Sequence, residues 1–410
     1  MTQTADTGAA PPSRSGREVL WAFLRLGLTS FGGPAAHLGY FRTEFVERRR
    51  WLDDRAFADL IALCQFLPGP ASSQAGVAIG LVRAGPLGAL AAWIGFTAPS
   101  ALLMILLGLG VHLLDAGWVG GLVHGLKLVA VAVVAQAVWG MARSLAPDRL
   151  RASIALAALG LVTLVAGGIG QIAALALGGV AGLWLCKPDQ AGAPSDLPVR
   201  TPRWLGFACL AAFAGLLLGL PLVAAITQAR PVAVAAAFYH SGALVFGGGH
   251  VVLPLLQDQV VRPGWVAPER FLAGYAAAQA LPGPLFTFAA YLGSLLRPGP
   301  NGVTGALLAL MAIFLPGMLL LFGALPFWSA LRARPQAQAA IQGANAAVVG
   351  VLAAALYNPV WVNAIFSPLD LLVAVAALVG LTVWRLSPVW IVAACAALGL
   401  LGAFGGHRLG

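Results

Sequence analysis

The sequence predicts an all-α polytopic membrane protein, built from two homologous halves as an inverted repeat with broken or re-entrant helices. The composition indicates the membrane class. Of the 410 residues, 60% are hydrophobic and 9% are charged, whereas an ordinary soluble domain has roughly 25% charged residues. This number of charged residues is too small to cover the surface of a soluble protein of this size. The composition therefore argues against a soluble enzyme, a nucleic-acid-binding module and a disordered chain. Apolar stretches of twenty or more residues favour helices, since membrane barrel strands alternate over about ten.

The remaining composition argues against several partners. The net charge is +10, but the basic residues are mostly Arg in short loops between apolar runs, a pattern that sets membrane orientation rather than nucleic-acid binding. The four cysteines are far apart and form no CxxC pattern, which predicts packed apolar thiols. We therefore expect the lipid bilayer as surroundings, no nucleic acid, no metal and no cofactor. The sequence is compatible with a homo-oligomer.

The chain divides into five segments. Residues 1–18 are polar and small and predict a disordered tail. The two halves are expected at 19–186 and 230–410. Between them, residues 187–203 (KPDQAGAPSDLPVRTPR) are rich in Pro and charge, which is typical of a linker. Residues 204–229 form an additional apolar run that predicts one extra transmembrane helix.

The two halves repeat the same motifs in the same order. SFGGPAAHLGY begins at Ser30 and VFGGGHVVLPL at Val245, and each is followed by an LPGP motif. Equivalent residues lie 214 to 218 positions apart and include Phe31 with Phe246, Trp51 with Trp265, Gln65 with Gln279, Pro68 with Pro282, Pro99 with Pro316 and Gly125 with Gly343. Such internal repeats are common in secondary transporters.

Loop charge predicts that the halves face opposite ways. The loop from Arg42 to Arg55 has five Arg, whereas its counterpart from Gln257 to Arg270 has two; the loop from Arg143 to Arg151 has three, and its counterpart from Trp361 to Pro368 has none. Because basic loops favour the cytoplasm, equivalent loops are expected on opposite sides. The N-terminus and linker are then cytoplasmic and the C-terminus is outside. About nine full crossings are expected if the interrupted segments are re-entrant, and about thirteen if they cross.

The FGG and PGP motifs interrupt apolar segments and indicate the substrate site. Proline removes a helix hydrogen bond, and the freed backbone groups are tolerated where they are buried in protein or line a watery cavity. Broken helices also expose N-terminal N–H groups that attract anions. The alternative is that these motifs only kink helices for packing.

Polar side chains near the breaks suit an oxyanion. Amides and hydroxyls can donate hydrogen bonds to it, although they can equally hydrogen-bond neighbouring helices. Lys127 lies within an apolar helix, where an ammonium indicates either a substrate pathway or snorkelling to an interface. The predicted substrate site comprises Phe31, Gly32, Gly33, Gln65, Pro68, Gly69, Pro70, Ser72, Ser73 and Lys127 in the first half, and Phe246, Gly247, Gly248, Gln279, Pro282, Gly283, Pro284 and Thr287 in the second. His37 and His250 follow the FGG motifs and are candidates for proton coupling, against packed structural roles.

Motifs of soluble-type enzymes are absent from the sequence. It contains no HExxH, GxSxG or Walker motif. The lack of an ATP-binding motif favours transport driven by an ion gradient, and we expect no enzyme activity.

These motifs resemble the chromate ion transporter family in its long, two-domain form. The resemblance is carried by SFGGPAAHLGYFRTEFVERRRWLDD, CQFLPGPASSQAGVAIG and GFTAPSALL in the first half, and by FGGGHVVLPLL and AGYAAAQALPGPLFTFAAYLG in the second. It covers nearly the whole chain apart from the tail and linker. The matching signatures are Phe31 to Pro34 with Pro68 to Pro70, and Phe246 to Gly249 with Pro282 to Pro284.

The resemblance implies an exporter in the bacterial inner membrane. It would carry chromate out of the cell by exchange with protons or another ion, and so confer chromate resistance. Sulfate is a dianion of the same shape, so a sulfate or other oxyanion transporter is the first alternative. A passive anion channel is the second. A membrane enzyme is a third, which the absence of redox motifs and paired cysteines argues against.

Overall fold

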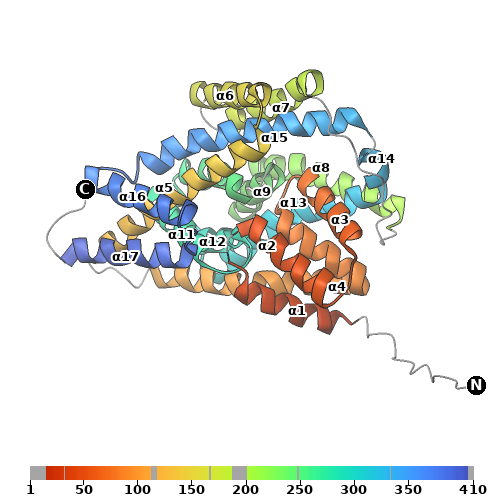
Figure 1. Cartoon of the computed structure of the whole chain (residues 1–410), viewed down its shortest axis with the longest axis horizontal. Coiled ribbons are helices and arrows are strands. Elements are labelled where there is room, and N and C mark those ends of the chain that lie inside the picture. Colours follow the sequence, from red (N-terminus) through yellow and green to blue (C-terminus); the bar gives the residue numbers. More distant parts are fainter. Residues whose placement is uncertain are drawn as a thin grey trace, which may run out of the picture.

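The computed structural model is a bundle of helices (Figure 1) and describes residues 15–31, 33–111, 118–165, 168–186, 201–246, 249–332 and 334–404. The first half contains α1 (Gly16–Thr29), α2 (Gly33–Phe41), the π-helix η1 (Arg42–Arg48), α3 (Asp54–Phe66), α4 (Ala71–Val111), α5 (Trp118–Leu145), α6 (Arg149–Leu164) and α7 (Gly168–Leu185). The extra helix predicted between the halves is α8 (Arg203–Thr227).

The second half contains α9 (Arg230–Ala243), η2 (Gly249–Val251), α10 (Val252–Leu256), the π-helix η3 (Gln257–Val261), α11 (Pro268–Ala280), η4 (Leu285–Thr287), α12 (Phe288–Leu295) and α13 (Gly302–Ala324). It continues with η5 (Leu325–Phe327), α14 (Trp328–Arg332), α15 (Pro335–Ala355), the π-helix η6 (Leu356–Trp361), α16 (Pro368–Thr382) and α17 (Pro388–Phe404). The order of elements in the two halves therefore corresponds, from α1 with α9 to α7 with α17.

The borders of the predicted segments shift slightly. Helix α1 begins inside the stretch 1–18 predicted as a tail, because the Ser15 hydroxyl accepts a hydrogen bond from the Glu18 N–H and so caps the helix. Residues 1–14 of that tail and 187–200 of the linker lie outside the described residues.

Helix α4 contains a turn that divides it into two helices. Ala84 and Gly85 leave the helical conformation, and Gly85 has a φ of +64°, a region that glycine adopts at little cost. The helices on either side pack closely, because a Cβ on Gly80 would meet the Gly88 carbonyl oxygen. The same approach joins α12 to α13 through Gly293 and Gly305. Both halves thus make the same hairpin after the PGP motif.

The halves exchange packing partners. Helix α5 packs on α16 and α17, and its repeat equivalent α15 packs on α6 and α7; Figure 1 shows both groups. Glycines permit the close approach on both sides: a Cβ on Gly125 would meet the Cys395 carbonyl, and a Cβ on Gly343 would meet the Gly178 carbonyl. Each half therefore supplies the surface on which the other half's central helix lies.

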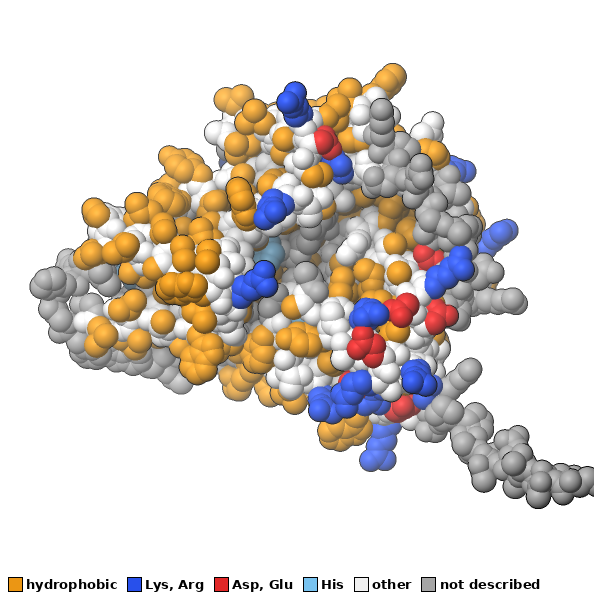
Figure 2. All heavy atoms as spheres, in the orientation of Figure 1, with side chains coloured by type: hydrophobic (Ala, Val, Ile, Leu, Met, Phe, Trp, Pro, Cys, Tyr) orange, Lys and Arg blue, Asp and Glu red, His pale blue; other side chains and the backbone are white. Residues whose placement is uncertain are grey.

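Five of the described helices are long and apolar enough to span a membrane. They lie at Ala71–Gly110, Gly120–Leu145, Arg203–Thr227, Gly302–Phe327 and Pro335–Asn358. Helix α8 is the most peripheral of them, since none of its spanning window is buried. Apolar side chains cover much of the surface, while acidic and basic ones gather over α1 to α3 (Figure 2). This surface confirms a multi-pass membrane protein; the number of crossings stays a prediction.

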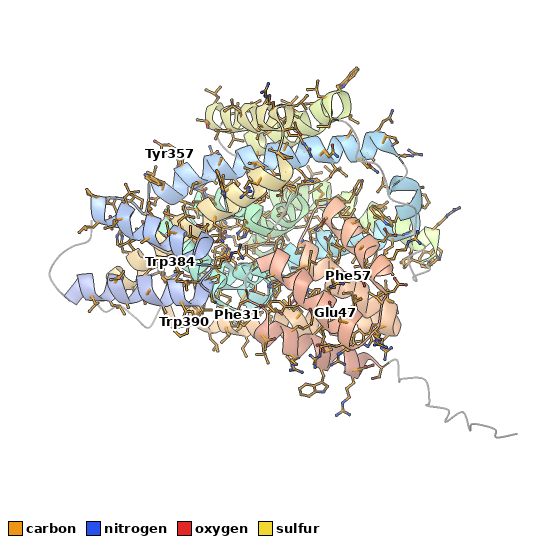
Figure 3. The ribbon with its side chains drawn as sticks, in the orientation of Figure 1. Phe31, Glu47, Phe57, Tyr357, Trp384 and Trp390 are labelled. Atoms are coloured by element: carbon orange, nitrogen blue, oxygen red, sulfur yellow. The ribbon has the colours of Figure 1, made fainter. Side chains whose placement is uncertain are left out.

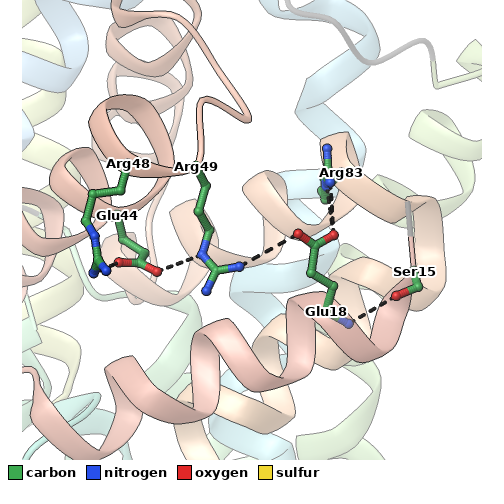
Figure 4. A network of polar contacts seen from close by, with 6 residues as sticks. All are labelled: Ser15, Glu18, Glu44, Arg48, Arg49 and Arg83. Carbon is green, nitrogen blue, oxygen red and sulfur yellow. Dashed lines mark hydrogen bonds and ion pairs between the residues drawn. The ribbon is translucent and has the colours of Figure 1, made fainter. Parts of the chain in front are cut away.

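The charged side chains near α1 form a connected network (Figure 4). Glu18 in α1 pairs with Arg83 at 2.9 Å and with Arg49 at 3.7 Å. Glu44 in η1 pairs with Arg49 at 2.6 Å and Arg48 at 2.7 Å. The network links α1, η1 and the end of the first α4 helix, so these charged side chains hold three elements together.

The glycine packing predicts a stability difference between two Gly→Ala variants. Gly343→Ala should lower the thermal unfolding temperature in detergent by several degrees, since the methyl group would collide with the Gly178 backbone. Gly140→Ala, in a helix with open space around it, should be neutral or stabilising, since Ala favours helices over Gly by about 1 kcal/mol. Equal effects of the two substitutions would contradict the packing described above.

Candidate substrate site

Four helix interruptions form the candidate site. In the first half they separate α1 from α2 after Thr29 and α3 from α4 after Phe66. In the second half they separate α9 from η2 after Ala243 and α11 from η4 after Ala280. All four coincide with the predicted FGG and PGP motifs. Gly32, Gly247 and Gly248, which the sequence also assigned to the site, lie outside the described residues.

Two hydrogen bonds join these interruptions across the halves. The Gly69 N–H donates to the Val245 carbonyl at 2.7 Å, and the Gly283 N–H donates to the Ser30 carbonyl at 3.0 Å. Gly69 and Gly283 are repeat equivalents, as are Ser30 and Val245, so the two bonds are the same bond made twice. Each PGP break therefore crosses the FGG break of the other half.

The local sequence explains this geometry. Gly69 has a φ of +126° and Gly283 a φ of +98°, both in the region that disfavours residues with a Cβ. The residue before each motif, Leu67 or Leu281, has the extended conformation expected before proline. The prolines end the incoming helix, and the glycine turns its N–H toward the partner carbonyl.

Each crossing is packed against a proline-containing helix. A Cβ on Gly69 would lie 3.0 Å from the Gly317 Cα, and a Cβ on Gly283 would lie 2.7 Å from the Ser100 hydroxyl. Gln74 fixes the first crossing, because its amide donates to the Gly317 carbonyl at 2.8 Å and to the Pro68 carbonyl at 3.2 Å. The site therefore includes the polar residues Gln74 and Ser100, which the predicted set omits.

The two candidate histidines lie beside the crossings but have different partners. His37 is buried, with its Nδ1 3.4 Å from the Ser72 hydroxyl and its ring 5.2 Å from that of Phe96. His250 has its Nδ1 2.9 Å from the Tyr275 hydroxyl and 3.3 Å from the Gln279 amide nitrogen. The Gln279 amide nitrogen can only donate, so the His250 Nδ1 accepts and its proton lies on Nε2. The Ser72 hydroxyl can donate or accept, so His37 can hold its proton on either nitrogen.

Several buried donors near the first-half break have no partner among the described residues. They are the hydroxyls of Ser30, Ser73 and Thr97 and the Nε2 atom of His37; the Gln74 Oε1 atom is an unpaired acceptor. Buried polar groups are nearly always paired, so an unpaired cluster calls for an explanation. Hydroxyl and imidazole groups of this kind can donate hydrogen bonds to an anion.

The other predicted residues divide into those near the breaks and those away from them. Ser72 and Thr287 are buried at the helix starts that follow the PGP motifs, and the Thr287 hydroxyl donates to the Pro284 carbonyl at 2.8 Å. Figure 3 shows Phe31 near the middle of the molecule. Gln65 is exposed, although its repeat equivalent Gln279 contacts His250.

Lys127 lies away from the crossings. Its ammonium is 6.0 Å from the centre of the Phe366 ring and within electrostatic range of Glu269 at the start of α11. Glu269 precedes the break at Leu281 by twelve residues, or about 18 Å of helix. Nearby, His124 pairs with the buried Asp370 at 2.7 Å. Lys127 therefore belongs to a polar cluster between α5 and α16.

Known proteins with similar sequences support a transport role for this geometry. The family model described as chromate transporter matches residues 17–183 and again residues 232–400. The chain belongs to the chromate transporter family. The double match supports the two halves found in the sequence, and the family consists of transporters rather than enzymes.

Individual relatives match over most of their length. The chromate transport protein of Pseudomonas aeruginosa is 30% identical over 85% of this chain and 82% of its own. The chromate transport protein of Cupriavidus metallidurans is 28% identical over 97% of each chain. No solved structure matches the chain. Among the described residues, no group of three His, Cys, Asp or Glu side chains could hold a metal ion.

The crossing geometry predicts that Gly69 and Gly283 tolerate no side chain. Gly69→Ala and Gly283→Ala each place a methyl group against the opposite helix and also incur the cost of a left-handed conformation, about 1–2 kcal/mol. Gly264→Ala is the matched control, since Gly264 has a φ of +75° but open space around it. We expect lower unfolding temperatures for the first two variants than for the control. If all three unfold alike, the crossings contribute no packing constraint.

Proposed function

We propose that the protein is a secondary active transporter that exports chromate across the bacterial inner membrane, by antiport with protons or another ion, and so confers chromate resistance. Family membership and the two relatives named as chromate transport proteins support the substrate. The observation that carries the site is the crossing of the four breaks, with unpaired donors beside it. Hydroxyl and imidazole donors suit a tetrahedral oxyanion, because they neutralise part of its charge without binding it irreversibly.

We place the two halves in opposite orientations in the membrane. The opposed loop charges support this arrangement, and the peripheral α8 supplies the odd crossing that an inverted repeat needs. The N-terminus is then cytoplasmic and the C-terminus outside. A two-fold axis in the membrane plane would exchange the two crossing bonds, which is the symmetry expected for alternating access around a central site.

Chromate flux in everted membrane vesicles tests the function. Vesicles containing the protein should accumulate chromate against its gradient when energised, and a protonophore should abolish the accumulation if protons are the coupling ion. Vesicles without the protein are the control. Equilibration without accumulation would identify a passive channel. Stronger inhibition by sulfate than by unlabelled chromate would favour a sulfate transporter.

Removing an unpaired donor separates a ligand-binding role from a structural one. Ser73→Ala and Thr97→Val should lower chromate flux about tenfold each, the loss expected for one hydrogen bond to a charged group. Both should leave thermal stability unchanged or raised, because the hydroxyls have no partner among the described residues. Ser294→Ala removes a buried hydroxyl that donates to the Tyr291 carbonyl, and should lower stability without affecting affinity. Unchanged flux in the first two variants would remove these donors from the site.

A further inference from the structure

Each half has a carboxylate–arginine pair on its π-helix. Glu44 pairs with Arg48 at 2.7 Å on η1, and Asp258 pairs with Arg262 at 3.3 Å at the end of η3. Both pairs are four residues apart, and the two acids and the two arginines are each 214 positions apart, the repeat offset at this point. π-helical turns are rare and frequently occur at functional sites. The pair is therefore a duplicated feature that the crossing site does not use.

Both pairs line pockets, and the first of these pockets reaches a helix break. The first pocket has a volume of 550 Å³ and reaches Thr29 and Ala36, on either side of the first break. The second has a volume of 710 Å³ and is lined by residues of α6, α7, α10, η3, α15 and η6. In the second pocket Gln171, which is 7% exposed, has an amide oxygen without a partner among the described residues. The walls of the two pockets differ, but the pairs occupy equivalent positions in both.

The arginine is the accessible member of each pair. The side chains of Glu44 and Asp258 are 8% and 16% exposed, whereas those of Arg48 and Arg262 are 57% and 62% exposed. A guanidinium group binds oxyanions through two parallel N–H donors. Because the guanidinium side of each pair is exposed, a dianion that enters the pocket can reach the arginine and compete with its carboxylate.

A second basic group stands at an equivalent position in each half. Arg25 of α1 lines the first pocket together with Arg48. Its repeat equivalent is His240 of α9, which lies within electrostatic range of Asp258 but is not among the residues that line the second pocket. Each π-helix pair is therefore accompanied by a basic residue from the helix that precedes the FGG break.

We propose that Arg48 and Arg262 are docking groups for a tetrahedral oxyanion, one in each half, held ready by Glu44 and Asp258, with Arg25 as a second basic group in the first pocket. This inference rests on the proposed function and adds an entry site on each side of the crossing. The carboxylate holds the guanidinium in the pocket until the oxyanion replaces the carboxylate as the partner of the arginine. The Asp258–Arg262 distance is 3.3 Å, against 2.7 Å for Glu44 and Arg48, so the second-half pair is the weaker of the two.

Substitutions in the second-half pair should have opposite effects. Arg262→Gln should raise the KM for chromate about tenfold, because the bidentate donor is lost. Asp258→Asn should lower the KM, because the guanidinium is no longer neutralised. If the ion pair had only a structural role, both substitutions would change the KM for chromate in the same direction. Arg262→Lys keeps the charge without the fork, and should raise the KM less. If the glutamine variant does not reach the membrane, the lysine variant replaces it.

The control is Arg149→Gln, an exposed arginine at the start of α6 that lines neither pocket; it should leave the KM unchanged. Calorimetric binding of sulfate to the purified protein is measured alongside. One outcome separates the two proposals: the wild type transports no chromate, but Arg262→Gln weakens sulfate binding and Asp258→Asn strengthens it. That outcome would contradict the transport proposal and support the docking site. A transporting wild type whose KM changes in the same direction in both variants, or in neither, would overturn the docking site.

Discussion

The structure depends on two backbone hydrogen bonds between the halves, from Gly69 to Val245 and from Gly283 to Ser30. A helix broken inside a membrane leaves N–H and C=O groups that lipid cannot satisfy. Here a backbone N–H group freed by a break in one half donates to a carbonyl group freed by a break in the other half. Each break therefore offsets part of the free-energy cost of leaving the other's backbone group without a hydrogen bond. One half alone would leave the Gly69 N–H and the Ser30 carbonyl unpaired. The duplication thus gives each break a backbone partner, and it brings the four breaks together in two crossings.

The surrounding helices hold this point in place. Since α5 lies on α16 and α17, and α15 lies on α6 and α7, neither half can move far without repacking the other. At Gly125 and Gly343 the backbones of the packed helices lie so close that one helix cannot shift along the other without a collision. A transport cycle that keeps both crossing bonds would therefore move segments outside this frame, such as α2 with η1, more than the frame itself.

The sequence predicted the breaks, the repeat and the extra helix because Gly, Pro and apolar length act locally. It predicted where the chain is interrupted, but not that the interruptions hydrogen-bond across the halves, since that pairing depends on tertiary packing. Gln65 and Gln279 illustrate the limit: they are equivalent in the repeat, yet one is exposed and the other contacts His250. Lys127 was recognisable as a charge in an apolar helix, but its neighbours Phe366 and Glu269 come from distant segments. The unpaired Thr97 hydroxyl had no local signal, because threonine is common in membrane helices.

The distribution of charge fits a site that must release its substrate. The described residues whose contacts define the crossing are neutral donors and helix starts, whereas the exposed arginines lie on the π-helices at the pockets. Conduction requires binding strong enough to admit an ion and weak enough to let it leave. A full positive charge at the crossing would hold a dianion too tightly. Pockets without any positive charge would not attract the dianion from solution. In the mechanism we propose, the arginines attract the substrate and the crossing recognises it, so that one chain meets both requirements.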